Sequence, residues 1–274
     1  MRDLTFVKLG GSLITDKRRR AHARRAVIRD LAEQLGRVLN RRSELDGRSP
    51  GILLGHGSGS FGHTAAIEHG FVDGPAVTPQ AAAEVARAAS RLNGLVVDAL
   101  LAAGVPAWSW APSGVIKARD GRLRGGGVGS LVEALDAGLV PVVYGDVVID
   151  VPGLAAIAST EAVVSYLRPR LRRRGYGLRE LVWLGETAGI WNSDGHVIES
   201  VNASNYRRVR RAVGGSAGAD VTGGMLLRLD TAWRLAQHGV GSLIADGRQP
   251  GLLEAALGAV HAPVPGTRVQ PPSA

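Results

Sequence analysis

The chain of 274 residues contains no cysteine. Disulfide bridges, thiolate metal sites and catalysis by a cysteine nucleophile are therefore excluded. A chain without cysteines fits the reducing cytosol, and we expect a cytoplasmic protein. Residues 1–8 read as the start of a strand, so we expect no signal peptide there.

Long apolar runs are missing as well. No stretch of 18 or more apolar residues occurs, so we expect no membrane-spanning helix and no membrane partner. Aromatic residues make up only 4% of the chain and hydrophobic residues 45%, which predicts an aliphatic, alanine-rich core. A chain of this length can form one large domain or two lobes.

Acidic residues are outnumbered by basic ones. The chain has 33 lysines and arginines against 24 aspartates and glutamates, a net charge of +9. Arginine supplies most of the excess, in clusters such as residues 18–20, 172–174 and 207–211. A nucleic-acid surface is one interpretation of such clusters. They are scattered and lack interleaved aromatics, so we expect a solvated basic surface and no nucleic-acid partner; a weaker interpretation is steering of anionic substrates.

Strand-like aliphatic runs alternate with helix-length, alanine-rich segments along the chain. This alternation predicts an α/β fold, a three-layer α/β/α sandwich with a mainly parallel central sheet. The expected strands are 4–9, 52–54, 106–110, 140–144, 181–184 and 242–246. The expected helices are 25–40, 61–69, 78–103, 130–137, 160–171, 223–238 and 252–257.

The glycine-rich stretch at residues 55–63 is the most informative about function. It reads GHGSGSFGH and follows the aliphatic run 51–54, which predicts a buried strand, a loop and then a helix. Glycines let the backbone approach an anion closely, and successive N–H groups of such a loop form an anion-binding nest. His63 falls one turn into the helix, within reach of an anion held there. The pattern indicates a phosphorylated small molecule as substrate.

A second glycine turn follows the first expected strand. Lys8 lies in the apolar run 4–9, where an unpaired ammonium is costly, so we expect it at the strand end, facing anions. Residues 10–12 form a turn with free N–H groups, and Lys17 follows in a basic segment. The carboxyl ends of strands are where open α/β sheets bind ligands. The sequence therefore predicts two phosphate-sized sites at one edge of the sheet.

These motifs resemble those of a known family. Residues 8–17, KLGGSLITDK, resemble the first motif of the amino acid kinase superfamily. Residues 57–63, GSGSFGH, are similar to the glycine loop of the isopentenyl phosphate kinases within it. Residues 144–148, 220–225 and 266–267 fall in the same order as in that family, so the resemblance covers essentially the whole chain.

The resemblance implies a fold, an activity and its cofactors. It implies a single amino acid kinase domain over residues 1–274, with a phosphate-acceptor lobe near 1–170 and a nucleotide lobe near 171–274. Such kinases transfer phosphate from ATP, with Mg²⁺, to isopentenyl phosphate and so make isopentenyl diphosphate, an isoprenoid precursor. The family is typically homodimeric, which we expect here too.

The resemblance also implies roles for individual residues. Gly10 and Gly11 would cradle the ATP phosphates, and Lys8 and Lys17 would neutralise charge on the transferred group as catalytic residues. His63, the third implied catalytic residue, would donate a hydrogen bond to the acceptor phosphate. The implied ATP-binding residues are Gly10, Gly11, Ser12, Asp220, Thr222, Gly223 and Arg228. The implied substrate-binding residues are Gly57, Ser58, Gly59, Gly62, His63 and Asp146, and no residue is assigned to a metal.

Three departures from the family pattern all lie in the nucleotide half. Residues 187–190 carry Ala188 where relatives have an acidic residue, Glu161 stands where many have an aspartate, and Arg228 replaces a lysine. Glu161 is one methylene longer than aspartate, and we interpret it as the acid that orients the lysines. Arginine is not a neutral swap for lysine. Two alternatives stay open: a kinase of another small phosphate or phosphonate such as fosfomycin, and a non-catalytic anion-binding or regulatory protein.

The hydrocarbon tail of isopentenyl phosphate needs an apolar pocket beside the glycine loop. The helices after His63 offer apolar side chains for it, among them Ile67, Phe71 and Val85. Many of their neighbours are alanines, as at residues 81–83. Because alanine is small, we expect room for longer prenyl phosphates.

Overall fold

The computed structural model describes residues 1–46, 51–71, 78–151, 153–215, 224–258 and 264–272. Its largest element is an eight-stranded sheet in which every neighbouring pair is parallel except β11 and β12. The strands in spatial order are β10 (Ser200–Val201), β12 (Thr267–Val269), β11 (Gly241–Asp246), β9 (Tyr176–Gly185), β1 (Arg2–Leu9), β2 (Gly51–His56), β6 (Val140–Tyr144) and β3 (Ala107–Ser109). All six expected strands are present, and the predicted parallel sheet is confirmed.

A second, four-stranded sheet was not expected from the sequence. Its order is β5 (Arg122–Leu123), β4 (Lys117–Arg119), β7 (Asp146–Asp150) and β8 (Ala155–Ala158). These strands have five residues or fewer, too short for a clear alternation of apolar and polar residues. Gly145 separates β6 from β7 within one apolar run, so a continuous hydrophobic stretch serves two sheets.

All seven expected helices are present, with two more that the pattern missed. They are α1 (Gly11–Ile14), α2 (Arg25–Asp46), α3 (Gly59–Glu68), α4 (Pro79–Ala102), α5 (Gly129–Asp136), α6 (Thr160–Arg173), α7 (Tyr206–Gly215), α8 (Gly224–Ala236) and α9 (Leu252–Ala256), with a 3₁₀ turn at Pro112–Gly114. The missed helices are α1, a single turn, and α7, whose sequence is dominated by arginine. Thr78 caps α4 as its composition suggests, because its side chain accepts a hydrogen bond from the Ala81 N–H at 3.1 Å.

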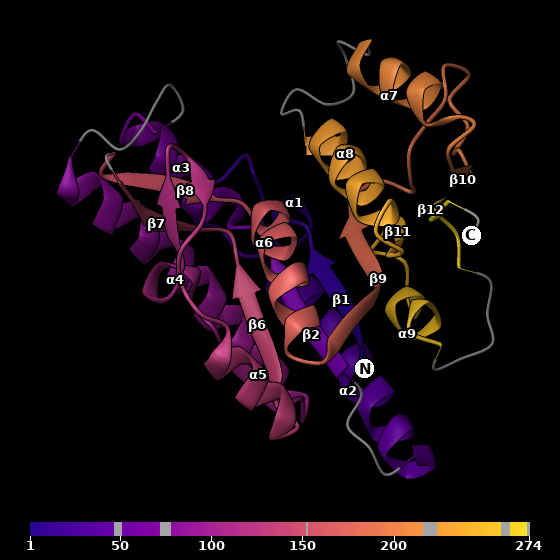
Figure 1. The fold of residues 1–274 in the computed structure, drawn as a ribbon, viewed down its shortest axis with the longest axis horizontal. Helices are drawn as coiled ribbons and strands as arrows, with labels where there is room; N and C mark the ends of the chain where they lie inside the picture. Colours follow the sequence, from indigo (N-terminus) through magenta and orange to yellow (C-terminus); the bar gives the residue numbers. More distant parts are fainter. Residues whose placement is uncertain (47–50, 72–77, 152, 216–223, 259–263, 273–274) are drawn as a thin grey trace.

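Helices cover both faces of the eight-stranded sheet (Figure 1). Alternation along β1 explains the two cores: Leu4 and Phe6 join one, and Val7 and Leu9 join the other. The first core is completed by α5, α6 and α8, and the second by α1, α2, α4 and α9. The three-layer α/β/α sandwich is therefore confirmed. No helix in the described ranges has both the length and the apolar character to cross a bilayer.

Strand register brings the two glycine turns together. β1 and β2 run parallel with Leu9 opposite His56, so both strands end at the same level. The Gly57 N–H donates to the Leu9 carbonyl at 3.0 Å, which binds the second loop to the end of the first strand. On the other side, the Gly10 N–H donates to the Leu184 carbonyl of β9 at 2.7 Å. The sheet edge formed by these ends carries the site.

The expected lobe boundary near residue 170 falls in the last turn of α6, shortly before β9 begins. The eight-stranded sheet continues across it, because β9 pairs directly with β1. The division into lobes near residue 170 stays a prediction.

Candidate active site

The two glycine turns lie in direct contact. A Cβ on Gly11 would stand 2.7 Å from the Gly59 nitrogen, and a Cβ on Gly57 would stand 2.9 Å from the Gly11 nitrogen. Real Cβ atoms do not approach a backbone so closely, so both positions require glycine. The N–H groups that follow β1 and those that follow β2 therefore form one continuous surface.

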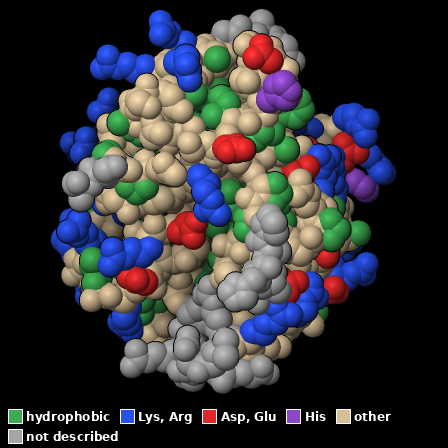
Figure 2. All heavy atoms as spheres, turned by 90° about the vertical axis from the view of Figure 1, so that its right-hand side faces the viewer, with side chains coloured by type: hydrophobic (Ala, Val, Ile, Leu, Met, Phe, Trp, Pro, Cys, Tyr) green, Lys and Arg blue, Asp and Glu red, His purple; other side chains and the backbone are tan. Residues whose placement is uncertain are grey.

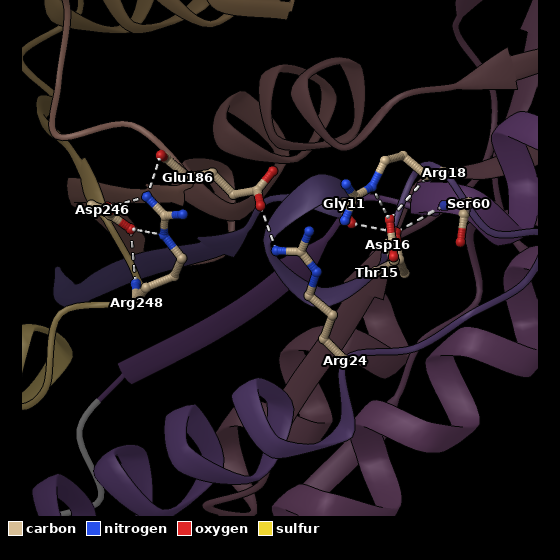
Figure 3. Close-up of polar contacts among 9 residues, drawn as sticks. All are labelled: Gly11, Thr15, Asp16, Arg18, Arg24, Ser60, Glu186, Asp246 and Arg248. Carbon is tan, nitrogen blue, oxygen red and sulfur yellow. Dashed lines mark hydrogen bonds and ion pairs between the residues drawn. The ribbon is translucent and has the colours of Figure 1, made fainter.

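Thr15 ties the two turns together. Its hydroxyl donates to the Gly11 carbonyl at 2.6 Å and accepts from the Ser60 N–H at 2.9 Å, and the residue is fully buried (Figure 3). One side chain thus joins the single turn of α1 to the start of α3. No local pattern singles out this threonine, because its role depends on a contact between residues 45 positions apart.

A cleft of about 650 Å³ opens at these turns. Its lining includes the cations Lys8, Lys17 and Arg228, together with His63 and Glu161. Gly11, Ser12 and Gly59 supply backbone to the same wall. The structure thus brings together eight of the residues predicted for the site, drawn from both predicted phosphate sites.

Lys8 and Glu161 form a buried ion pair at the base of the cleft. The Lys8 ammonium donates to Glu161 Oε1 at 2.7 Å, and the residues are 5% and 9% exposed. Burial lowers the pKa of Lys8, helped by Arg228 and Lys17 and opposed by Glu161. Burial works against ionisation of Glu161, but the Lys8 charge and hydrogen bond outweigh it and hold the pKa of that carboxyl below its ordinary value. Glu161 therefore orients Lys8 as an anion.

Arg228 lies against the end of β9. A Cβ on Gly185 would stand 3.1 Å from Arg228 Nη1, so the absence of a side chain at Gly185 makes room for the guanidinium. Lys17 is exposed and also lines the cleft, from the segment between α1 and α2. The cations thus approach the cleft from three elements, and the lost lysine at 228 is replaced by a charge in the same space.

Other predicted residues lie in the two turns or behind them. Gly10, Gly57 and Ser58 belong to the turns but are not among the cleft-lining residues. Gly62 is required by packing, because a Cβ there would lie 2.4 Å from Ser58 Oγ. His63 lies one turn into α3 and is exposed at the cleft wall.

Asp146 lies outside the cleft lining. It is 3% exposed, and its carboxylate accepts from the Ser113 N–H at 2.9 Å and the Val147 N–H at 2.8 Å. Burial raises the pKa of Asp146, against these hydrogen bonds. In this arrangement Asp146 joins β7 to the 3₁₀ turn, and its contact with a substrate stays a prediction. Asp220, Thr222 and Gly223 lie outside the described residues.

A carboxylate that sequence reasoning missed lines the cleft two residues before Ala188. Glu186 follows β9 directly, and its side chain pairs with Arg24, which precedes α2 (Figure 3). Arg248 donates to the Glu186 carbonyl at 2.8 Å and to both oxygens of Asp246. Glu186 could have been found from its position directly after a strand end, at the same sheet edge as the glycine turns.

The cleft is also lined by apolar side chains. Ile190, Trp191, Val213 and Met225 line it, and Trp191 is 54% exposed. The Ile190 N–H donates to Thr267 Oγ1 at 2.7 Å, so the predicted C-terminal motif supports this wall. A cleft lined by both cations and apolar side chains suits a ligand that combines phosphates with a flat ring.

Basic side chains do not gather into one patch on the face drawn in Figure 2. Lysines and arginines are spread around its rim and lie among acidic side chains. Several are paired, as Arg210 with Asp230 at 2.8 Å and Arg268 with Glu180 at 3.6 Å. Within the described ranges, no cluster of three or more histidine, aspartate or glutamate side chains is placed to hold a metal ion.

A family model described as "Amino acid kinase family" matches residues 3–246 of the chain. The chain belongs to the amino acid kinase family. Members of the family with curated names are similar over nearly the whole chain. Isopentenyl phosphate kinase from Methanothermobacter thermautotrophicus is 31% identical, with 97% of this chain and 98% of that protein covered. Isopentenyl phosphate kinase from Haloferax volcanii is 32% identical, with coverages of 82% and 86%.

The fold comparison agrees. A solved structure described as "X-ray structures of isopentenyl phosphate kinase" superposes with a TM-score of 0.76 at 27% identity, covering 97% of this chain and 99% of that one. The resemblance based on residues 8–17 and 57–63 is thereby confirmed.

Proposed function

We propose that the protein transfers the γ-phosphoryl group of ATP to isopentenyl phosphate, giving isopentenyl diphosphate and ADP. The observation that carries the proposal is the contact between the two glycine turns, with Lys8, Lys17, Arg228 and His63 around one cleft. Two phosphates bound to adjoining backbone surfaces can meet in line. The names of the similar proteins support the acceptor assignment.

The chemistry explains why so many cations line one wall. An oxygen of the acceptor phosphate forms a bond to the γ-phosphorus, while the bond from that phosphorus to the β–γ bridging oxygen breaks and ADP leaves. Two like charges about 4 Å apart repel by about 4 kcal/mol at an effective dielectric of 20. Lys8, Lys17 and Arg228 offset this repulsion, and the backbone N–H groups position the phosphates. The acceptor oxygen is already a nucleophile, so no covalent intermediate with the protein is needed.

The nucleotide fills the cleft from Gly11 to Trp191 in this proposal. The turn at residues 10–12 holds the β- and γ-phosphates, and the base lies against Trp191 among the apolar side chains. Mg²⁺ enters with the nucleotide, since it is usually bound by substrate phosphates and one or two carboxylates rather than by a protein cage. Two carboxylates line the described part of the cleft, Glu161 and Glu186. Because Glu161 is paired with Lys8, we assign the contact with Mg²⁺ to Glu186, whose side chain also pairs with Arg24.

The acceptor lies on the α3 side. Residues 57–59 hold its phosphate, and His63 donates a hydrogen bond to it. A small apolar cluster between α3, α4 and the second sheet offers a place for its tail: Ala66, Phe71, Ala81, Val85, Val147 and Ala155. Alanines make up half of that cluster, which supports room for prenyl tails longer than five carbons.

We also propose a cytoplasmic homodimer, as the family resemblance implies. Trp108, 51% exposed, lies on β3 at the edge of the eight-stranded sheet, where a second copy would cover it. The molar mass in solution tests this: twice the 28.6 kDa of one chain supports it, and one chain mass overturns it.

ADP release with three candidate acceptors tests the function. Isopentenyl phosphate, dimethylallyl phosphate and fosfomycin are each supplied with MgATP, and ³¹P NMR identifies the product. The proposal predicts the highest kcat/KM with isopentenyl phosphate and a new diphosphate signal. Preference for fosfomycin would make the protein a phosphonate kinase, and nucleotide or phosphate binding without turnover of any acceptor would make it a regulatory member.

A further inference from the structure

His56, which the proposed reaction does not use, lies buried beneath the acceptor turn. It is the last residue of β2, is 0% exposed and stacks on Tyr144 of β6, with ring centroids 5.6 Å apart and planes 11° from parallel. Its Nδ1 lies 3.1 Å from the Gly57 carbonyl, and its Nε2 lies 3.1 Å from Asn93 Oδ1. Asn93 in turn contacts Ser109 Oγ at 2.7 Å.

The contacts define which ring nitrogen carries the proton. A carbonyl can only accept, so the hydrogen bond to Gly57 requires a proton on Nδ1. Burial lowers the pKa of His56 against the hydrogen bonds to Gly57 and Asn93, and the charge of Lys8 adds to the effect of burial, so the environment favours the neutral ring. In the structure Asn93 Oδ1 faces Nε2, and the Asn93 NH₂ group donates to Ser109 Oγ. A neutral ring with its proton on Nδ1 requires the amide to be turned over, so that its NH₂ group donates to Nε2 and its oxygen accepts from the Ser109 hydroxyl.

Peptide geometry links this buried bond to the opposite side of the 57–58 peptide. In a trans peptide the carbonyl and the following N–H point in opposite directions. Because the Gly57 carbonyl points inward to His56, the Ser58 N–H points away from the ring. Within the part of the chain that the structure describes, the N–H groups of Ser58 and Gly59 have no hydrogen-bond acceptor. A Cβ on Gly145 would stand only 3.4 Å from the Ser58 nitrogen, so the missing side chain leaves space beside it.

We propose that His56 is a positioning residue for the acceptor: by holding the Gly57 carbonyl, it directs the Ser58 N–H at the phosphate of the acceptor. The ligand class is a phosphate monoester dianion, and the assignment rests on the proposed function of the 57–59 turn. His56 touches neither substrate. Asn93 fixes the plane of the ring from α4, so the turn is oriented from behind by two buried side chains.

Two substitutions separate positioning from packing. His56→Asn keeps an amide N–H near the place of Nδ1 and loses the contact at Nε2, whereas His56→Gln reaches toward Asn93 and loses the donor to Gly57. Both remove the ring and its stack on Tyr144, and they differ from each other by one methylene group. Thermal unfolding of both variants checks that they remain folded under assay conditions.

The expected result is a split between the substrates. In His56→Gln the KM for isopentenyl phosphate rises roughly tenfold, the size of one lost hydrogen bond, while the KM for ATP stays within about twofold of wild type. His56→Asn restores the acceptor KM to within about threefold of wild type. Equal acceptor KM values in the two variants, or equal rises in both substrates' KM values, would overturn the proposal.

A binding readout that needs no turnover keeps this inference separate from the function. The ¹⁵N–¹H resonances of Ser58 and Gly59 are followed as inorganic phosphate is added. The inference predicts saturable shifts in wild type and His56→Asn, and their loss in His56→Gln. Shifts without kinase activity would overturn the proposed reaction but support the role of His56. Normal kinase activity with no shift at Ser58 in wild type would support the proposed reaction but overturn the role of His56.

Discussion

Lys8 of β1 and Glu161 of α6 meet at 2.7 Å beneath the cleft although 153 positions separate them in the chain. The pair joins the strand that leads into the nucleotide turn to a helix on the first core's side of the sheet. Both members are buried, so neither can be released to solvent without disturbing the fold.

Replacing Glu161 with glutamine is expected to cost both stability and activity. The Lys8 ammonium would remain buried beside a neutral amide, and breaking a buried pair by removing one partner costs about 3–5 kcal/mol. The free energy of unfolding, from urea denaturation, measures this. Glu180→Gln is the control, because its pair with Arg268 is half-exposed and 3.6 Å long, and its loss should cost less than about 1 kcal/mol. Equal costs for the two substitutions would contradict the role given to Glu161.

The stability lost in Glu161→Gln should depend on pH. The pKa of Glu161 is lower in the folded protein than in the unfolded chain. The ionised carboxylate therefore stabilises the fold above the ordinary carboxyl pKa of about 4.3. This contribution is lost as pH falls through the lower pKa that Glu161 has in the folded protein. The difference in unfolding free energy between wild type and Glu161→Gln should stay constant from about pH 6 to 8 and shrink below about pH 4. A difference that grows on acidification would show that the carboxyl pKa is raised instead.

Gly11→Ala should abolish phosphate transfer. Its methyl group would lie 2.7 Å from the Gly59 nitrogen, so the two turns would be forced apart. We expect kcat/KM to fall at least a hundredfold, because a misplacement of about 1 Å costs that much in a positioned reaction. Gly94→Ala in α4 is the control: nothing lies within 4 Å of its Cβ, and alanine favours a helix by about 0.5–1 kcal/mol. Retained activity in Gly11→Ala would mean that the turns do not need to touch.

Trp191 should report nucleotide binding by its fluorescence. The chain has five tryptophans, and Trp191 is exposed in the cleft whereas Trp108 is equally exposed outside it. ATP should quench the emission of wild type and of Trp108→Phe, and quench Trp191→Phe far less. Trp191→Ala should raise the KM for ATP roughly tenfold, since stacking on a base contributes about 1–3 kcal/mol. Quenching that persists in Trp191→Phe would place the base elsewhere.

Long aliphatic and alanine-rich segments could be predicted from the sequence because each carries enough residues for its period to show. The strand 4–9 and the helix 78–103 are examples, and their alternation was sufficient to predict a parallel sheet covered on both faces. The strands β4, β5, β7 and β8 were not predicted. The first two have only three and two residues, and β7 continues the apolar run of β6 beyond Gly145, so the pattern does not mark it as a strand of a second sheet.

The residues of the site also differ in whether a local pattern identifies them. Lys8, Gly11, Gly59 and His63 could be found because glycine turns after strands have a local reason to bind anions. Thr15 and Glu186 were missed, since each acts through a partner distant in sequence: Ser60 for the hydroxyl and Arg24 for the carboxylate. For Asp146 the family resemblance implies a substrate contact, which stays a prediction, while the structure shows its carboxylate accepting hydrogen bonds from the backbone.

A crystal structure with a non-hydrolysable ATP analogue and isopentenyl phosphate tests the central claim most directly. We expect the γ-phosphate at residues 10–12 and the acceptor phosphate at residues 57–59, on either side of the contact between Gly11 and Gly59, with His63 against the acceptor. An acceptor phosphate bound anywhere outside that cleft, or an imidazole of His63 turned away from it, would contradict the account.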